Sequence, residues 1–183
     1  MSLSDIAKYI RTWGTTGAIA PSGKALARRM VRHVDPAGSG MILELGPGTG
    51  VVTRALLEKG VAPARIIAVE FNPDFCRIVG ERYPGVRVVQ GDAYSLDQTL
   101  HGIHDGGFAA AVSSLPLLLR EPADRINLVK SVLARLPRTS ALAQFSYSPK
   151  PPVPASPLDW RLEGSGWILM NMPPARVWTY RPV

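Results

Sequence analysis

The sequence predicts an α/β fold in which helices cover both faces of a mostly parallel β-sheet. Short apolar segments of strand length alternate with segments of helical length along most of the chain, as expected for parallel strands joined by helices. A glycine-rich turn joins the first apolar segment to the helical segment that follows it. Near the C-terminus two apolar segments flank Pro173 and Pro174, which predicts an antiparallel hairpin at one edge of the sheet.

The first helix is expected over residues 2–13. Its apolar stripe consists of Leu3, Ile6, Ile10 and Trp13, which recur at intervals of three and four residues. Lys8 and Arg11 lie off this stripe, and an apolar stripe with basic neighbours suits a membrane surface. The alternative is that the stripe covers one face of the sheet, with Trp13 in the core.

A second helix is expected over residues 22–34. Its apolar row consists of Leu26, Met30 and Val34, and this row favours packing against the sheet. Lys24 and Arg28 begin a basic row that continues through Arg32 and is widened by Arg29. Because basic side chains near an anionic bilayer favour binding, Lys24 and Arg28 are expected to contribute to membrane attraction.

The remaining elements alternate along the chain. Strands are expected at residues 41–45, 65–70, 86–90, 107–113 and 139–146, and helices at 51–59, 73–82, 95–100 and 122–135. The strands are short and apolar on both sides, as in a sheet covered on both faces. Residues 148–157 contain five prolines and are expected to form an extended loop. The hairpin strands are expected at residues 166–172 and 175–180, with Trp178 and Tyr180 in the core.

The composition fits a single domain with an anionic partner. The formal net charge of +7 indicates nucleic acid or an acidic lipid surface, and ordinary solubility charge is the alternative. The single cysteine, Cys76, cannot form an internal disulfide, which is consistent with a reducing compartment. The first residues lack the apolar core of a secretory signal, and no apolar run reaches the ~18 residues of a membrane span. The three histidines, His33, His101 and His104, show no metal-ligand spacing and are expected on the solvated surface.

The turn after the first strand is the strongest functional signal. Gly46, Gly48 and Gly50 occupy alternate positions, so the backbone can turn sharply and a ligand can approach the main chain. Val51 stands where a dinucleotide-binding fingerprint requires glycine. Glu44, on the strand just before the turn, would repel a pyrophosphate but attract a cationic sulfonium amino acid.

A carboxylate ends the second predicted strand. Glu70 lies twenty residues after Gly50, where an acid can accept hydrogen bonds from both hydroxyls of a ribose. Gly91-Asp92-Ala93 follows the third predicted strand. Asp92 is therefore expected at the same sheet edge, and capping of the short helix at 95–100 is its alternative role.

The segment Glu44-Leu45-Gly46-Pro47-Gly48-Thr49-Gly50 resembles motif I of the class I methyltransferases that use S-adenosylmethionine. The resemblance implies a Rossmann-like sheet of seven strands with a C-terminal antiparallel hairpin, and no metal. It implies that Phe71 covers the adenine, that Asp92 accepts from the adenine amino group and that the Ala93 amide donates to a ring nitrogen. The expected cofactor-binding residues are Glu44, Gly46, Pro47, Gly48, Thr49, Gly50, Glu70, Phe71, Asp92, Ala93 and Ser114.

Ser113-Ser114-Leu115-Pro116-Leu117, after the fourth predicted strand, resembles motif IV of the same class. Amine methyltransferases that act on nucleobases have Asn or Asp where this chain has Ser114, and Tyr where it has Leu117. The turn at Ser114 and Leu115 can still position an amine, but the base-stacking aromatic ring is absent. The leucines through Leu119 either form an apolar wall beside the substrate or pack beneath the following helix.

Aromatic residues provide candidates for contact with a methylated ammonium, because such a cation binds the face of an aromatic ring. Tyr147, at the end of the fifth predicted strand, is the expected substrate residue and a candidate route for amine deprotonation. Tyr9 and Trp13 are expected to close over the substrate. With Ser114 and Leu115, Tyr147 completes the set of expected catalytic residues.

Three further segments, Thr16–Ser22, Gln144–Pro149 and Pro173–Trp178, resemble the bacterial phospholipid N-methyltransferases, relatives of the rRNA adenine dimethylases. This resemblance implies stepwise conversion of phosphatidylethanolamine to phosphatidylcholine, with S-adenosylhomocysteine as product. It implies a cytoplasmic enzyme on the inner face of the cell membrane that binds phospholipid headgroups and no nucleic acid. The expected division is a membrane-binding or lid segment at 1–35 and a methyltransferase domain at 36–183. The alternatives are an rRNA adenine N6-methyltransferase and a non-catalytic interfacial protein.

Overall fold

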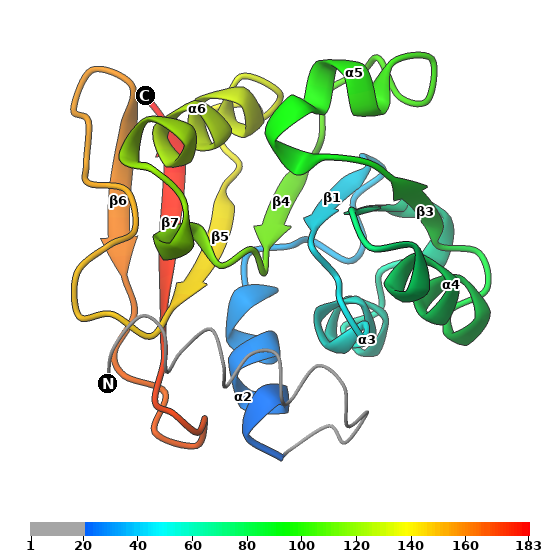
Figure 1. Ribbon diagram of the computed structural model, residues 1–183, viewed down its shortest axis with the longest axis horizontal. Helices are drawn as coiled ribbons and strands as arrows, with labels where there is room; N and C mark the ends of the chain where they lie inside the picture. The colour runs from blue at the N-terminus through cyan, green and yellow to red at the C-terminus, as the bar shows by residue number, and fades with distance from the viewer. Residues whose placement is uncertain (1–20) are drawn as a thin grey trace.

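The computed structural model describes residues 21–183 (Figure 1). The predicted first helix, with Lys8, Tyr9, Arg11 and Trp13, lies outside the described residues. The strands are β1 (Ile42–Leu45), β2 (Ile66–Glu70), β3 (Arg87–Gln90), β4 (Ala110–Ser113), β5 (Leu142–Ser146), β6 (Trp160–Gly164) and β7 (Arg176–Pro182). The helices are α2 (Pro21–Met30), α3 (Val51–Glu58), α4 (Pro73–Arg82), α5 (Leu96–Leu100) and α6 (Pro122–Leu133). Short 3-10 turns η1, η2 and η3 occupy Pro63–Arg65, Ala93–Ser95 and Leu117–Leu119.

The sheet has seven strands in the order β3-β2-β1-β4-β5-β7-β6. The strands from β1 to β5 pair in parallel, whereas β7 runs antiparallel to both β5 and β6. This confirms the predicted α/β fold, including the antiparallel pair at the C-terminal edge. The strand order reverses between β1 and β4, which is where open parallel sheets bind their ligands.

Helices cover both faces of the sheet, and each face has its own apolar core (Figure 1). On one face α2 and α3 pack over alternate residues of the central strands. On the other face α5 and α6 enclose the opposite set, to which Trp178 and Tyr180 belong as predicted. Among the described residues, no helix has the length and apolar character needed to cross a bilayer.

Helix α2 packs against the sheet, as its apolar row predicted. Leu26, Ala27 and Met30 are buried, and the helix contacts β5, β7 and α3. Lys24 is exposed, and the Arg28 guanidinium lies 3.8 Å from the Glu58 carboxylate on α3. The apolar row therefore faces the core, while Lys24 and Arg28 face away from it.

The predicted position of the first hairpin strand is wrong. The strand that pairs with β7 is β6, residues 160–164, whereas residues 166–172 form a loop with one isolated bridge between Ile168 and Ala175. Leu169 and Met170 are about three-quarters exposed, so the apolar character of this segment marks surface rather than sheet. Residues 148–157 contain no helix, as their prolines predicted.

Candidate active site

The turn between β1 and α3 supplies the main-chain surface of the site. Its three glycines all have positive φ, with values of 66° at Gly46, 54° at Gly48 and 84° at Gly50. A Cβ on Gly46 would lie 2.8 Å from Leu115 Cδ2, so glycine lets the segment after β4 approach the turn. A Cβ on Gly48 would meet no atom within 4 Å. The space above Gly48 is therefore open to a ligand.

Glu70, at the end of β2, is fixed by backbone amides. Its Oε2 accepts a hydrogen bond of 3.0 Å from the Gly48 amide, and its Oε1 accepts one of 2.9 Å from the Asn72 amide. The carboxylate thus ties the glycine turn to β2. Each oxygen can accept a further hydrogen bond, so Glu70 can still hold ribose hydroxyls.

Asp92 is brought to the same edge by the pairing of β2 with β3. The Gly91 amide donates to the Glu70 carbonyl at 2.9 Å, which places the next residue beside Glu70. Asp92 Oδ1 accepts from the Tyr94 amide at 2.9 Å, so the capping role is observed. Within residues 21–183, Asp92 Oδ2 accepts no hydrogen bond and remains available to a ligand.

A cavity of about 370 Å³ lies at the carboxyl ends of the parallel strands, and its lining includes Gly46, Glu70 and Asp92 but not Gly48. Six predicted site residues line it: Gly46, Glu70, Phe71, Asp92, Ala93 and Leu115. Phe71 is 75% exposed at the cavity, where its ring is free to cover a ligand. The volume lies within the usual range of small-molecule sites, so one binding site gathers residues that are far apart in the sequence.

The segment after β4 forms one wall of the cavity. The Ser114 amide donates to the Leu45 carbonyl at 2.8 Å, which holds this segment beside β1. Leu115 and Leu119 line the cavity, whereas Leu117 is buried in the core below. Leu115 and Leu119 therefore lie at the cavity and Leu117 packs in the core, while contact of the leucines with a substrate stays a prediction.

Gln144 begins a segment that the sequence singled out by resemblance, but its positioning role was not predicted. Its buried side chain on β5 donates from Nε2 to the Leu115 carbonyl at 2.9 Å. This bond fixes the main chain of the wall segment from the neighbouring strand. No motif signals the contact, because it depends on the register between β4 and β5.

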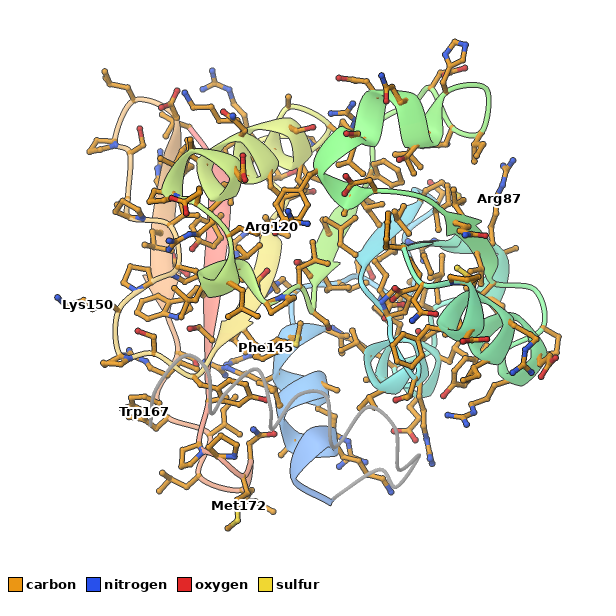
Figure 2. All side chains as sticks on the ribbon, viewed as in Figure 1. Arg87, Arg120, Phe145, Lys150, Trp167 and Met172 are labelled. Carbon is orange, nitrogen blue, oxygen red and sulfur yellow. The ribbon has the colours of Figure 1, made fainter. Side chains whose placement is uncertain are left out.

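Arg120 and Tyr94 also line the cavity, although no spacing in the sequence singled them out. The Arg120 guanidinium lies over the Tyr94 ring, 4.6 Å from its centroid. In the view of Figure 2, Arg120 lies between α6 and β4. It brings a positive charge to the cavity, where an anionic part of a substrate can bind.

Tyr147 does not line this cavity. It follows β5 and packs with Phe145 on the face covered by α2, with ring centroids 5.4 Å apart. Ser114 is likewise absent from the cavity lining, although its neighbour Leu115 belongs to it. Pro47, Thr49 and Gly50 belong to the turn behind Gly46, and the Pro47 carbonyl accepts from the Gly50 amide at 2.8 Å.

Glu44 is fully buried on β1 beneath the glycine turn. Its Oε2 accepts from the Thr53 hydroxyl at 2.8 Å, and its Oε1 has no partner in the described residues. Burial, with a smaller contribution from the charge of Glu70, raises the pKa of Glu44 to about 7. Glu44 does not line the cavity, but a buried carboxyl group with one unpartnered oxygen beneath the turn fits a cationic ligand group, as a sulfonium amino acid provides.

We expect Asp92→Ser to separate ligand binding from capping. Serine can still accept the Tyr94 amide, so the melting temperature should stay within a few degrees of the parent value. Serine cannot supply the second carboxylate oxygen, so affinity for S-adenosylmethionine should fall about tenfold, or ~1.4 kcal/mol. Calorimetric titration and thermal unfolding measure the two effects. A loss of stability with unchanged affinity would leave Asp92 as a cap alone.

Comparisons with known proteins agree with this geometry. A methyltransferase domain family model matches residues 42–138, which contain the glycine turn, Glu70, Asp92 and the wall segment. The ornithine lipid N-methyltransferase of Singulisphaera acidiphila is 31% identical over 135 residues, which cover 70% of each chain. The ribosomal RNA small subunit methyltransferase A of Methylococcus capsulatus is 33% identical over 113 residues, 57% of this chain but only 42% of that protein.

Among solved structures, the TehB-like SAM-dependent methyltransferase of Corynebacterium glutamicum is similar along nearly its whole length. The match covers 98% of this chain and 97% of that chain, with a TM-score of 0.65 and 16% sequence identity. This similarity concerns the fold, and the family model and the curated relative concern the sequence. Together with a site that fits a sulfonium nucleoside, they show that the chain belongs to the S-adenosylmethionine-dependent class I methyltransferases.

Proposed function

We propose that this methyltransferase acts on the amine of phosphatidylethanolamine at a membrane surface and methylates it stepwise to phosphatidylcholine. The observation that carries the proposal is the similarity to a lipid N-methyltransferase over 70% of both chains. Ornithine lipid and phosphatidylethanolamine share an amine on a hydrophobic anchor. The same site chemistry, an apolar wall beside a bound methyl donor, therefore suits both.

Different residues of the cavity would have different roles in an in-line methyl transfer. S-Adenosylmethionine, when bound, supplies a methyl group on a positively charged sulfur. The glycine turn and Glu70 hold the nucleoside, while Leu115 and Leu119 exclude water from the point of attack. Gln144 holds the Leu115 main chain in place through its carbonyl oxygen, which can still accept a second hydrogen bond from the attacking amine. Arg120, which lines the cavity, would pair with the phosphodiester of the headgroup.

An exposed apolar loop supports action at a bilayer. Between β6 and β7 the chain exposes Trp167, Leu169, Met170 and Met172, two of which are labelled in Figure 2. The loop joins β7 at Arg176, which pairs with Ser146 at the carboxyl end of β5. The apolar side chains therefore project from the sheet edge that carries the cavity. A cluster of exposed apolar residues at this position suits insertion into a lipid interface.

A labelled-methyl assay tests the proposal. With S-adenosylmethionine and vesicles containing phosphatidylethanolamine, we expect label in mono-, di- and trimethylated lipid. With ribosomal RNA as acceptor we expect none, because Leu117 is buried and stands where the RNA enzymes have a base-stacking tyrosine. Label in adenine, with unlabelled lipid, would instead support the rRNA methyltransferase that the partial relative suggests.

We expect Leu169→Ser to weaken binding to phosphatidylethanolamine vesicles several-fold while leaving affinity for S-adenosylmethionine unchanged. The substitution removes an apolar side chain that is 77% exposed in the β6–β7 loop. Leu158→Ser is the matched control, because Leu158 is 92% exposed just before β6, at the opposite edge of the sheet. Vesicle sedimentation compares the two variants. An equal effect of both substitutions would contradict insertion of the β6–β7 loop.

A further inference from the structure

A second cavity, of about 390 Å³, lies between α2 and the β6–β7 pair. From the helix side it is lined by Arg29, Arg32 and His33, and from the strands by Glu163 and Arg181, among others. It shares no lining residue with the cofactor cavity. In the strand order, β7 and β6 are two and three strands away from β4, where the apolar wall of the cofactor cavity begins.

The three guanidinium groups of this cavity are free to bind a ligand. Among the described residues, none of Arg29, Arg32 and Arg181 forms an ion pair or a side-chain hydrogen bond. Glu163 is the single acid in the lining, and no arginine of the cavity lies within salt-bridge distance of it. Three positive charges and one negative charge leave a net charge of +2 in the lining.

A histidine, His33, also lines this cavity. His33 is half-buried and its Nε2 has no hydrogen-bond partner in the described residues, contrary to the solvated position predicted from the sequence. Burial, followed by the charges of Arg181 and Lys59, lowers the pKa of His33 to about 4. A neutral imidazole can donate one hydrogen bond to an anion without adding to the charge.

The carbonyl groups at the end of α2 do not oppose an anion. Lys59 Nζ donates to the Val31 carbonyl at 2.8 Å and to the Arg32 carbonyl at 2.6 Å. The negative end of the helix dipole is thereby neutralised on the side of α3. The arginine side chains remain directed to the cavity, whose lining lacks a compensating acid other than Glu163.

We propose that this cavity binds a phosphate group, with Arg29, Arg32 and Arg181 as its ligands and His33 as a further hydrogen-bond donor. Guanidinium groups bind phosphate through paired hydrogen bonds. The three positive charges of the arginines exceed the single negative charge of Glu163. The volume leaves room for part of the molecule that carries the phosphate. This cavity is separate from the cofactor cavity. The proposal of a phosphate site therefore does not depend on which methyl acceptor the enzyme uses.

The double substitution Arg29→Gln/Arg181→Gln tests this site. The matched control is Arg77→Gln/Arg138→Gln, which removes the same charge from exposed arginines outside the cavity. Titration with inorganic phosphate and with glycerol 3-phosphate tests a soluble source. Flotation with phosphatidylcholine vesicles, with and without phosphatidic acid, tests a lipid source. We expect the cavity variant to lose at least tenfold in affinity for whichever of these two phosphate sources the parent protein binds. The affinity of the control variant should change little.

Histidine resonances provide a second readout. Phosphate in the cavity should raise the pKa of His33 from about 4 toward its ordinary value, because an adjacent anion stabilises the imidazolium. His101 and His104, which lie outside the cavity, should not respond. Binding of soluble phosphate alone, or of phosphatidic acid vesicles alone, supports the site and identifies the source. No binding in either experiment, or equal losses in the cavity and control variants, would overturn it.

Discussion

The substitution Gly48→Val is expected to weaken S-adenosylmethionine binding at least 100-fold, or ~2.7 kcal/mol. Gly48 adopts φ 54°, and nothing in the protein lies within 4 Å of the position its Cβ would take. A valine side chain would fill the space that the cofactor requires at the main chain. It would also strain the amide that donates to Glu70 Oε2 at 3.0 Å. Calorimetric titration with S-adenosylmethionine measures the loss.

The matched control is Gly102→Val. Gly102 has φ 66°, and its Cβ would likewise meet no atom within 4 Å, but it lies in the turn after α5. Both substitutions impose a β-branched side chain on left-handed backbone, so they should lower the melting temperature by similar amounts. Only Gly48→Val should weaken cofactor binding at least ~100-fold. If both variants bind S-adenosylmethionine like the parent protein, the cofactor does not approach the β1–α3 turn.

The central sheet and the glycine turn can be predicted from the sequence because each is specified by residues that are close together in the chain. The strand before Gly46 is apolar apart from Glu44, and all of β1 and β2 is buried, so the pattern and the environment agree. Glu70 and Asp92 follow parallel strands directly, and parallel strands bring their carboxyl ends to one edge. Position along the chain was therefore enough to bring these residues together.

The C-terminal hairpin was misplaced because hydrophobicity alone does not distinguish a strand from an exposed apolar loop. Residues 166–172 are more apolar than β6, yet Leu169 and Met170 face solvent. The strand that pairs with β7 has one deeply buried residue, Trp160, and an exposed Glu163. Its pairing with β7 depends on contacts across the sheet rather than on its own composition.

The site residues that the sequence missed depend on distant contacts. Gln144 reaches Leu115 across the pairing of β5 with β4, and Arg120 reaches Tyr94 across 26 residues of chain. The second cavity, lined by Arg29, Arg32 and Arg181, combines α2 with β6 and β7, which come from opposite ends of the chain. Such groupings follow from strand order and helix packing, and a linear pattern of residue types does not contain them.

The buried Glu44 should make both stability and cofactor affinity depend on pH near neutrality. Its pKa is about 7 in the folded protein, against an ordinary value of 4.5 that the unfolded chain retains. The folded state therefore binds the extra proton between these values. The stability that this group contributes is complete below pH 4.5 and is lost as the pH rises through 7. The difference corresponds to about 3 kcal/mol.

Glu44→Gln is expected to remove this pH-dependent part of stability. Glutamine can still accept the Thr53 hydroxyl, which donates to Glu44 Oε2 at 2.8 Å, but it does not ionise. The difference in unfolding free energy between parent and variant should therefore change by about 3 kcal/mol between pH 4.5 and 8, in favour of the variant at high pH. Urea denaturation across this range measures it. A constant difference would mean that Glu44 titrates normally.

Cofactor binding should show the opposite preference, because the ionised carboxylate attracts the cationic amino acid part of S-adenosylmethionine. Affinity of the parent protein is expected to rise with pH through about 7, with release of a proton that calorimetry in buffers of different ionisation enthalpy detects. Glu44→Gln should bind about tenfold more weakly at pH 8, or ~1.4 kcal/mol, and release no proton. The variant would then be more stable at high pH yet bind the cofactor more weakly. This combination would show that the ionised Glu44 serves cofactor binding. A carboxylate whose only role was to stabilise the fold would not lower stability in the pH range where it ionises.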